Sequence, residues 1–132
     1  MRTFIKSKLA CAVIIAGLII LNGCKKDDEV KTDADNLTGT WSVSETVSGS
    51  TTTYSSTITK KSSNVIMISS ERTNPPAYYM NNLEVTVKWA EKKIEKTGTS
   101  FSGTVASEND FEIHFTYGTS GTVYSVSQHY TR

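Results

Sequence analysis

The chain has 132 residues, and its 14 lysine and arginine residues nearly balance 13 aspartate and glutamate residues, for a formal net charge of +1. Because it lacks a basic excess or a basic stripe, we do not expect it to bind nucleic acid. This length suits one domain with a modest hydrophobic core.

The N-terminal region has the three parts of a secretory signal peptide. Residues 1–8 carry three basic residues and no acidic one, residues 9–21 are largely apolar, and the small residue Gly23 stands at the exit. A retained transmembrane helix is the alternative. The thirteen residues of the apolar run, at about 1.5 Å each, reach roughly 20 Å and fall short of a hydrocarbon core of about 30 Å. We therefore expect residues 1–23 to be cleaved.

The end of this signal contains Leu21, Gly23 and Cys24. It resembles the bacterial lipobox, although Asn22 is larger than the residue usually found there. The resemblance implies cleavage before Cys24, whose thiol would carry a diacylglyceryl group, and two or more acyl chains anchor a protein stably. Since Cys11 leaves with the signal, the mature chain would have no free thiol, no disulfide and no cysteine metal site.

Residues 24–36 are charged and polar with little apolar content, which predicts a flexible tether. Within it, residues 25–29 read Lys-Lys-Asp-Asp-Glu. This run is either a solvated charge cluster or a signal that resembles the export signal of surface lipoproteins in Bacteroidetes-type bacteria. The second interpretation implies an outer-membrane protein exposed at the cell surface. Loss of the three basic residues of the signal would leave the mature chain with a formal charge of −2.

Residues 37–132 are rich in threonine, serine, valine, isoleucine and aromatic residues, which suit a pleated, half-buried surface. Short alternating segments predict strands over residues 40–48, 51–60, 65–70, 83–89, 101–105, 111–117 and 124–130. For residues 90–96 we favour a hairpin that turns near residues 91–92 over a short helix. The fold is therefore predicted to be all-β, an antiparallel up-and-down meander that closes into a small barrel of about eight strands. A two-layer sandwich is the alternative.

The domain opens with Gly39-Thr40-Trp41, which resembles the Gly-x-Trp signature on the first strand of lipocalins. In that family a basic residue near the end of the last strand lies over the tryptophan and closes the barrel, and Arg132 has this position here. The segment Phe101-Ser102-Gly103-Thr104-Val105 extends the resemblance to the short lipocalin-like domains of Bacteroidetes lipoproteins. The second lipocalin motif is missing and the domain is short, which argues against a large ligand cavity.

Five residues are candidate ligand contacts. Tyr78, Tyr79 and Met80 lie in the longest irregular stretch, where they would either cover the open end of a barrel or plug it as core. Glu45 interrupts an apolar face, so it either points into the barrel with a partner or polar ligand, or lies at a bulge or a strand end open to water. Trp89 ends an alternating segment and completes the set.

The histidines, His114 and His129, lie opposite the aromatic rows, and two such residues do not make a convincing metal site. The sequence contains neither an acid–base pair nor a nucleophile–base set, so we do not expect an enzyme. We expect a monomeric, lipid-anchored outer-membrane protein, with no cofactor beyond its lipid, that binds a small apolar or amphipathic molecule. The alternative is a solid barrel that presents its loops to an envelope protein.

Overall fold

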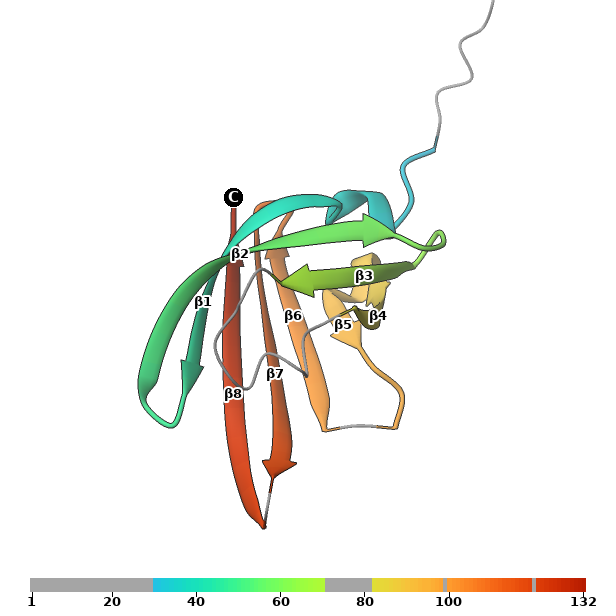
Figure 1. The fold of residues 1–132 in the computed structure, drawn as a ribbon. Helices are drawn as coiled ribbons and strands as arrows, with labels where there is room; N and C mark the ends of the chain where they lie inside the picture. The colour runs from blue at the N-terminus through green and yellow to red at the C-terminus, as the bar shows by residue number, and fades with distance from the viewer. Residues whose placement is uncertain (1–29, 71–81, 99, 120) are drawn as a thin grey trace, which may run out of the picture. The chain divides into compact units, whose positions relative to one another are not determined.

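The computed structural model describes residues 30–70, 82–98, 100–119 and 121–132 (Figure 1). The chain divides into two compact units, Met1–Val30 and Lys31–Arg132, and the second unit contains every strand described below. In the described part of the chain, no helix has the length and apolar character needed to cross a bilayer.

Eight antiparallel strands form a closed barrel in sequence order. They are β1 (Gly39–Val47), β2 (Ser50–Lys60), β3 (Val65–Ser70), β4 (Leu83–Lys88), β5 (Lys93–Glu95), β6 (Phe101–Ser107), β7 (Asp110–Thr119) and β8 (Thr122–Thr131). Each strand pairs with the next, and β1 pairs with β8 to close the sheet. The predicted all-β up-and-down barrel is confirmed, and the two-layer sandwich is wrong.

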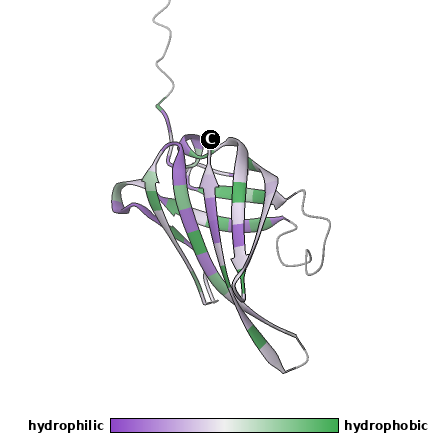
Figure 2. Ribbon diagram, turned by 90° about the vertical axis from the view of Figure 1, so that its left-hand side faces the viewer, coloured by the Kyte–Doolittle hydropathy of each residue, from purple (hydrophilic) through white to green (hydrophobic). Residues whose placement is uncertain are grey.

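The strands form where the sequence alternates between apolar and polar residues. Along β4, Leu83, Val85 and Val87 are buried while the residues between them are more exposed. Figure 2 shows the same alternation of hydrophobic and hydrophilic residues along the strands. Successive side chains of a strand point to opposite faces, so each apolar row faces the barrel interior.

The segment around residues 89–95 forms the hairpin that was favoured. A single 3₁₀ turn, η3 (Trp89–Glu91), is followed by Lys92 in the left-handed region at φ 55°, and β5 then pairs back onto β4. The Lys92 backbone N–H donates to the Trp89 carbonyl oxygen at 3.1 Å. The helical spacing of this segment was therefore not decisive, because pairing with β4 and β6 outweighs it.

The meander places successive connections at opposite ends of the barrel (Figure 1). The β2–β3, β4–β5 and β6–β7 turns lie at one end, which we call the closed end. The opposite, open end holds the β1–β2, β5–β6 and β7–β8 connections. The interior near the closed end is filled by large buried side chains: Leu37, Trp41, Ile58, Ile66, Val87, Val105, Phe111 and Tyr130.

Residues 31–38 pack against the closed end, and we call them the strap. The strap includes a 3₁₀ turn, η1 (Ala34–Asn36), and both Ala34 and Leu37 are fully buried. The prediction of a tether over residues 24–36 is therefore wrong for its second half, and the folded unit begins at Lys31 rather than at residue 37. The strap is too short to show a hydrophobic period, and its order comes from contacts with distant turns. Residues 24–29 lie outside the described part of the chain.

The β7–β8 hairpin extends past its neighbours at the open end. Strand β6 pairs with β7 only as far as Phe115, and β1 pairs with β8 only as far as Val126. Among the described residues, positions 116–119 and 122–125 pair only with each other. The rim of the barrel is thus uneven, with this hairpin forming its tallest side.

Candidate functional site

A buried polar cluster lies where the first and last strands meet. Glu45 on β1 and Gln128 on β8 are direct cross-strand partners, only 1% and 0% exposed. Gln128 Nε2 donates to Glu45 Oε2 at 2.6 Å and to the Tyr54 hydroxyl at 2.9 Å. The Tyr54 hydroxyl donates to Glu45 Oε2 at 2.9 Å, and the Tyr130 hydroxyl donates to Gln128 Oε1 at 2.9 Å. These hydrogen bonds offset the cost of burying the carboxylate.

Of the alternatives for Glu45, the inward-pointing carboxylate with a partner is the one observed. The side chain lies within a regularly paired stretch of β1, so a bulge or a strand end open to water is wrong. Sequence reasoning missed Tyr54 and Gln128 as its partners. A signal was present, because Gln128 interrupts the apolar row of β8 as Glu45 interrupts that of β1. A matched pair of polar interruptions on the first and last strands is what closure of the barrel would bring together.

Below the polar cluster, three aromatic rings form the floor of the interior. The rings of Phe111 and Tyr130 stack with centroids 4.3 Å apart, and Trp41 meets Phe111 edge-on at 4.8 Å. The Trp41 indole N–H donates to the Leu37 carbonyl oxygen at 2.9 Å, so its only polar atom is satisfied. This end of the interior is filled by buried side chains that pack against one another.

Arg132 covers the floor from outside, in the position expected from the sequence. Its guanidinium carbon lies 4.4 Å from the Trp41 ring centroid. Its Nη1 donates to the Thr38 carbonyl oxygen at 2.8 Å and its Nη2 to the Asn36 carbonyl oxygen at 3.0 Å. The same side chain therefore caps the tryptophan and holds the strap.

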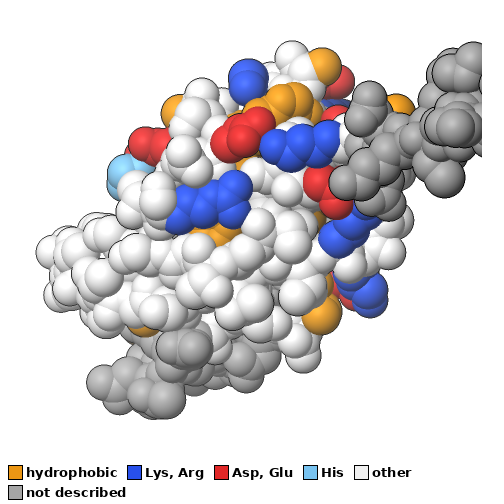
Figure 3. Space-filling model, turned by 90° about the horizontal axis from the view of Figure 1, so that it is seen from above, with side chains coloured by type: hydrophobic (Ala, Val, Ile, Leu, Met, Phe, Trp, Pro, Cys, Tyr) orange, Lys and Arg blue, Asp and Glu red, His pale blue; other side chains and the backbone are white. Residues whose placement is uncertain are grey.

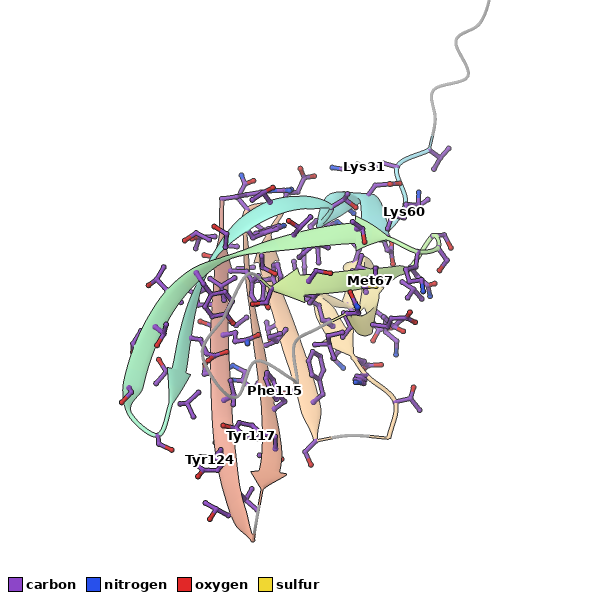
Figure 4. All side chains as sticks on the ribbon, viewed as in Figure 1. Lys31, Lys60, Met67, Phe115, Tyr117 and Tyr124 are labelled. Atoms are coloured by element: carbon purple, nitrogen blue, oxygen red, sulfur yellow. The ribbon has the colours of Figure 1, made fainter. Side chains whose placement is uncertain are left out.

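At the open end an apolar cavity of about 140 Å³ lies between β4, β6 and β7. We call it the mouth pocket, and it is lined by Leu83, Lys96, Ser100, Phe101, Phe115, Thr116 and Tyr117. The rings of Phe101 and Phe115 stack at 6.2 Å. The Tyr117 ring stacks on Tyr124 at 5.1 Å across the protruding hairpin. Figure 4 shows Phe115, Tyr117 and Tyr124 on the half of β7 and β8 remote from the strap.

Two larger hollows, of about 490 and 470 Å³, lie on the outer surface of the barrel. The first crosses the outer face of β7 and β8 and is lined mainly by serine and threonine. The second follows β5 and β6. Both are open to solvent. The first has the same serine and threonine character as much of the outer face, and the second is lined in part by the charged side chains of Lys93, Glu95 and Lys96.

Of the remaining predicted contacts, Trp89 is the one that lies among the described residues. Trp89 lies at the closed end, half-buried in η3, with the Lys92 ammonium 4.2 Å from its ring centroid. The structure therefore does not bring Trp89 together with Glu45 or the mouth pocket. Tyr78, Tyr79 and Met80, and the predicted lipidation site Cys24, lie outside the described residues.

Both histidines lie on the outer face and pair with carboxylates. His129 Nε2 is 3.0 Å from Asp110 Oδ1, and His114 Nε2 is 3.5 Å from Glu112 Oε2. Across the described ranges, no three histidine, cysteine, aspartate or glutamate side chains are grouped as metal ligands.

Comparisons with solved structures find similar barrels at low sequence identity. A redesigned β-barrel, b11L5F_LGL, matches with a TM-score of 0.53 and 18% identity, over 78% of this chain and 96% of that one. EF1p2_mFAP2b, whose structure is of a complex with DFHBI, matches with a TM-score of 0.49 and 17% identity, over 77% of this chain and 98% of that one. No protein-family model matches the chain, and no curated protein sequence does. The first likeness supports the barrel fold and nothing finer.

Proposed function

We propose that the barrel binds a small apolar or amphipathic molecule at its open end. The observation that carries this proposal is the mouth pocket, an apolar cavity walled by Leu83, Phe101, Phe115 and Tyr117. Ligand sites in proteins are typically concave, mostly apolar and provided with a few polar groups. Here the polar side chains that line the pocket include Lys96, Ser100 and Thr116.

The size of the mouth pocket limits what can enter it. A cavity of about 150 Å³ accommodates benzene, whereas drug-sized ligands occupy about 300–1,000 Å³. The pocket, at about 140 Å³, therefore fits a single ring or a short alkyl segment. We propose that such a group inserts between the aromatic side chains while the polar part of the ligand stays at the rim.

We further propose that the chain is an outer-membrane lipoprotein anchored through Cys24. The support is the order of residues in the sequence: a basic start, a short apolar run, and Leu21 and Gly23 before the cysteine. The test is metabolic labelling with an alkyne fatty acid in a bacterium that processes lipoproteins. We expect label on the full chain and none on Cys24→Ser, and an unlabelled wild-type chain would refute the anchor.

Ligand binding is tested with a series of straight-chain alcohols. The protein is the chain from residue 24 onward carrying Cys24→Ser, and binding is followed by NMR shifts of the aromatic side chains. Each buried methylene contributes about 0.8 kcal/mol, so affinity should rise roughly fourfold per carbon until the pocket is full and then level off.

The matched variants for this test differ in which face of the barrel they alter. Leu83→Phe adds volume inside the pocket and should abolish the rise in affinity with chain length. Ser102→Phe adds the same ring to the outer face of β6 and should leave it unchanged. Equal behaviour of the two variants would argue against the mouth pocket as the site.

The second candidate is an interaction module with a solid interior. The observation that favours it is the filled closed end, together with a mouth pocket smaller than most ligand sites. In that case, cross-linking in cells should capture a reproducible envelope protein, and Leu83→Phe should not alter the capture. Loss of the same partner in the Leu83→Phe protein would instead support the ligand site.

A further inference from the structure

We infer that the strap holds the closed end of the barrel toward the membrane, so that the mouth pocket faces away from it. This inference rests on the lipid anchor proposed at Cys24 and concerns the source of the ligand. The chain enters the folded unit at Lys31. Contacts with the turns of the closed end and with Arg132 fix the strap that follows.

The first contacts join the strap to two turns of the closed end. The Ala34 backbone N–H donates to the Ser63 carbonyl oxygen at 3.0 Å, in the β2–β3 turn. The Trp89 backbone N–H donates to Asp33 Oδ2 at 3.1 Å, in the β4–β5 turn. The first bond joins two backbone groups and so fixes the path of the strap at Ala34, while the second holds the Asp33 side chain against the turn.

Charged side chains add further contacts. Lys60 Nζ lies 2.9 Å from both Asp35 carboxylate oxygens, and Lys31 Nζ lies 2.9 Å from Glu108 Oε1 in the β6–β7 turn. Asp35 also accepts hydrogen bonds from the Thr32 hydroxyl at 2.6 Å and the Thr32 backbone N–H at 2.8 Å. Together with the Arg132 bonds to the end of the strap, these contacts reach every turn of the closed end.

The mouth pocket lies at the other end of the same strands. Leu83 lines the pocket as the first residue of β4, while Trp89, which contacts the strap, follows the last residue of that strand. Figure 1 shows η1 at one end of the barrel and the β7–β8 turn at the other. The point where the chain enters and the point where a ligand would enter are therefore separated by the height of the barrel.

Chain length makes the opposite orientation costly. From Cys24 to Lys31 the chain advances seven residues, which span at most about 25 Å when fully extended. The ten residues of β8 span about 33 Å along the strand, or roughly 25 Å of barrel height at the usual tilt. A barrel with its mouth on the bilayer would need a fully extended connection, whereas a barrel resting on its closed end needs no extension.

Charge does not explain the orientation, because the closed end carries both signs. Figure 3, which looks down on this end, shows lysine and arginine side chains interspersed with aspartate and glutamate. The ion pairs at this end include Lys31 with Glu108 and Lys60 with Asp35. The closed end is therefore neither strongly attracted to nor repelled by anionic headgroups. In this orientation a ligand would enter the mouth pocket from the side that faces away from the supporting bilayer.

The test measures the distance of each end of the barrel from the bilayer. The mature chain has no cysteine besides Cys24, so Ser62→Cys at the closed end and Thr122→Cys at the open end each give one labelling site. Both positions are exposed. Each full chain is purified from bacterial membranes, labelled with a donor fluorophore and reconstituted in phosphatidylethanolamine–phosphatidylglycerol vesicles that contain an acceptor lipid.

We expect at least about twofold higher energy transfer from position 62 than from position 122, since a barrel height of roughly 25 Å separates them. A flexible insert of about 20 glycine and serine residues before Lys31 should bring the two efficiencies together, because its average span approaches the barrel height. Equal or reversed efficiencies without the insert would overturn the inference.

The orientation of the barrel and the proposed ligand site are tested by separate experiments, so a failure of one can be told from a failure of the other. Alcohol binding is measured on the unanchored chain, so its failure leaves the orientation result standing. A full chain that does not float with the vesicles refutes the anchor and the orientation together, and it leaves the alcohol result intact.

Discussion

Glu45 and Gln128 lie 83 positions apart in the sequence, yet Gln128 Nε2 is only 2.6 Å from Glu45 Oε2 inside the barrel. The contact crosses the seam at which β1 and β8 close the sheet. Both side chains are buried, so each depends on the other, and on the Tyr54 and Tyr130 hydroxyls, to satisfy its polar atoms. Closure of this barrel is thus secured by a specific polar contact as well as by backbone pairing.

Replacing Gln128 should destabilise the fold more than a surface change. Gln128→Leu keeps a similar volume but removes both bonds donated by the amide, and we expect a loss of about 2–4 kcal/mol in the free energy of unfolding. Urea denaturation measures this loss. Glu45→Leu together with Gln128→Leu should recover part of it, because the carboxylate is no longer buried without its amide partner. If the free energy of unfolding of Gln128→Leu lies within about 0.5 kcal/mol of that of the wild type, the contact between Glu45 and Gln128 does not stabilise the fold.

Removing the Arg132 side chain should loosen the strap and uncover Trp41. Arg132→Met forfeits a cation–π contact and two hydrogen bonds to strap carbonyl oxygens, and we expect a loss of about 1–2 kcal/mol. Arg132→Lys keeps the charge without the planar fork and should rescue less than half of the loss. Hydrogen exchange of the strap amides gives the local readout. If Arg132→Lys restored the full stability, a positive charge at this position would be sufficient to hold the strap, and the planar guanidinium would not be needed.

Acid should weaken the strap through Asp35. Hydrogen bonds from Thr32, and then the bond and charge of Lys60, hold the pKa of this carboxyl well below its ordinary value near 3.8. The unfolded chain therefore takes up this proton more readily, so the stabilisation is complete above about pH 5. It begins to decline as the pH approaches the ordinary value and is fully lost only when the pH falls through the lowered pKa of the folded state. Unfolding curves between pH 6 and pH 2 should show a shallower pH dependence for Asp35→Asn. If Asp35→Asn showed the same dependence of stability on pH as the wild type, Asp35 would not contribute to the loss of stability in acid.

Gly103 should tolerate no side chain, because the neighbouring strands β5 and β7 both approach it closely. A Cβ atom there would lie 2.8 Å from Ile94 Cβ, 3.0 Å from the Glu112 carbonyl oxygen and 3.0 Å from Ile113 Cγ2. We expect Gly103→Ala to cost about 1–3 kcal/mol, as overpacking of a core does. Gly118→Ala is the matched control, since its nearest atom would be 3.6 Å away. Equal thermal stability of Gly103→Ala and Gly118→Ala would contradict the close approach of β5 and β7 to Gly103.

Much of the fold could be predicted because apolar and polar residues alternate along the strands. Residues such as Leu83, Val85 and Val87 recur with period two, and this places most of the strands and their inward faces. Residues 90–96 also fit helical spacing, so β5 could not be placed in this way. The contact between Trp41 and Arg132 was also predicted, but from the resemblance to the lipocalin signature and not from local alternation. The site was predicted less well. Glu45 was identified as an anomaly, but its partners and the mouth pocket were not.

By itself, the sequence determined the strands, their order and the faces that point inward, because these depend on residues two positions apart. Only the tertiary structure decided what depends on sheet curvature and closure. Closure selected Gln128 as the partner of Glu45, and the turns of the closed end gave order to a polar strap around Ala34 that shows no period of its own. The same curvature left a space beside Phe115 at the open end. Contacts of this kind join residues far apart in the chain, and no local pattern encodes them.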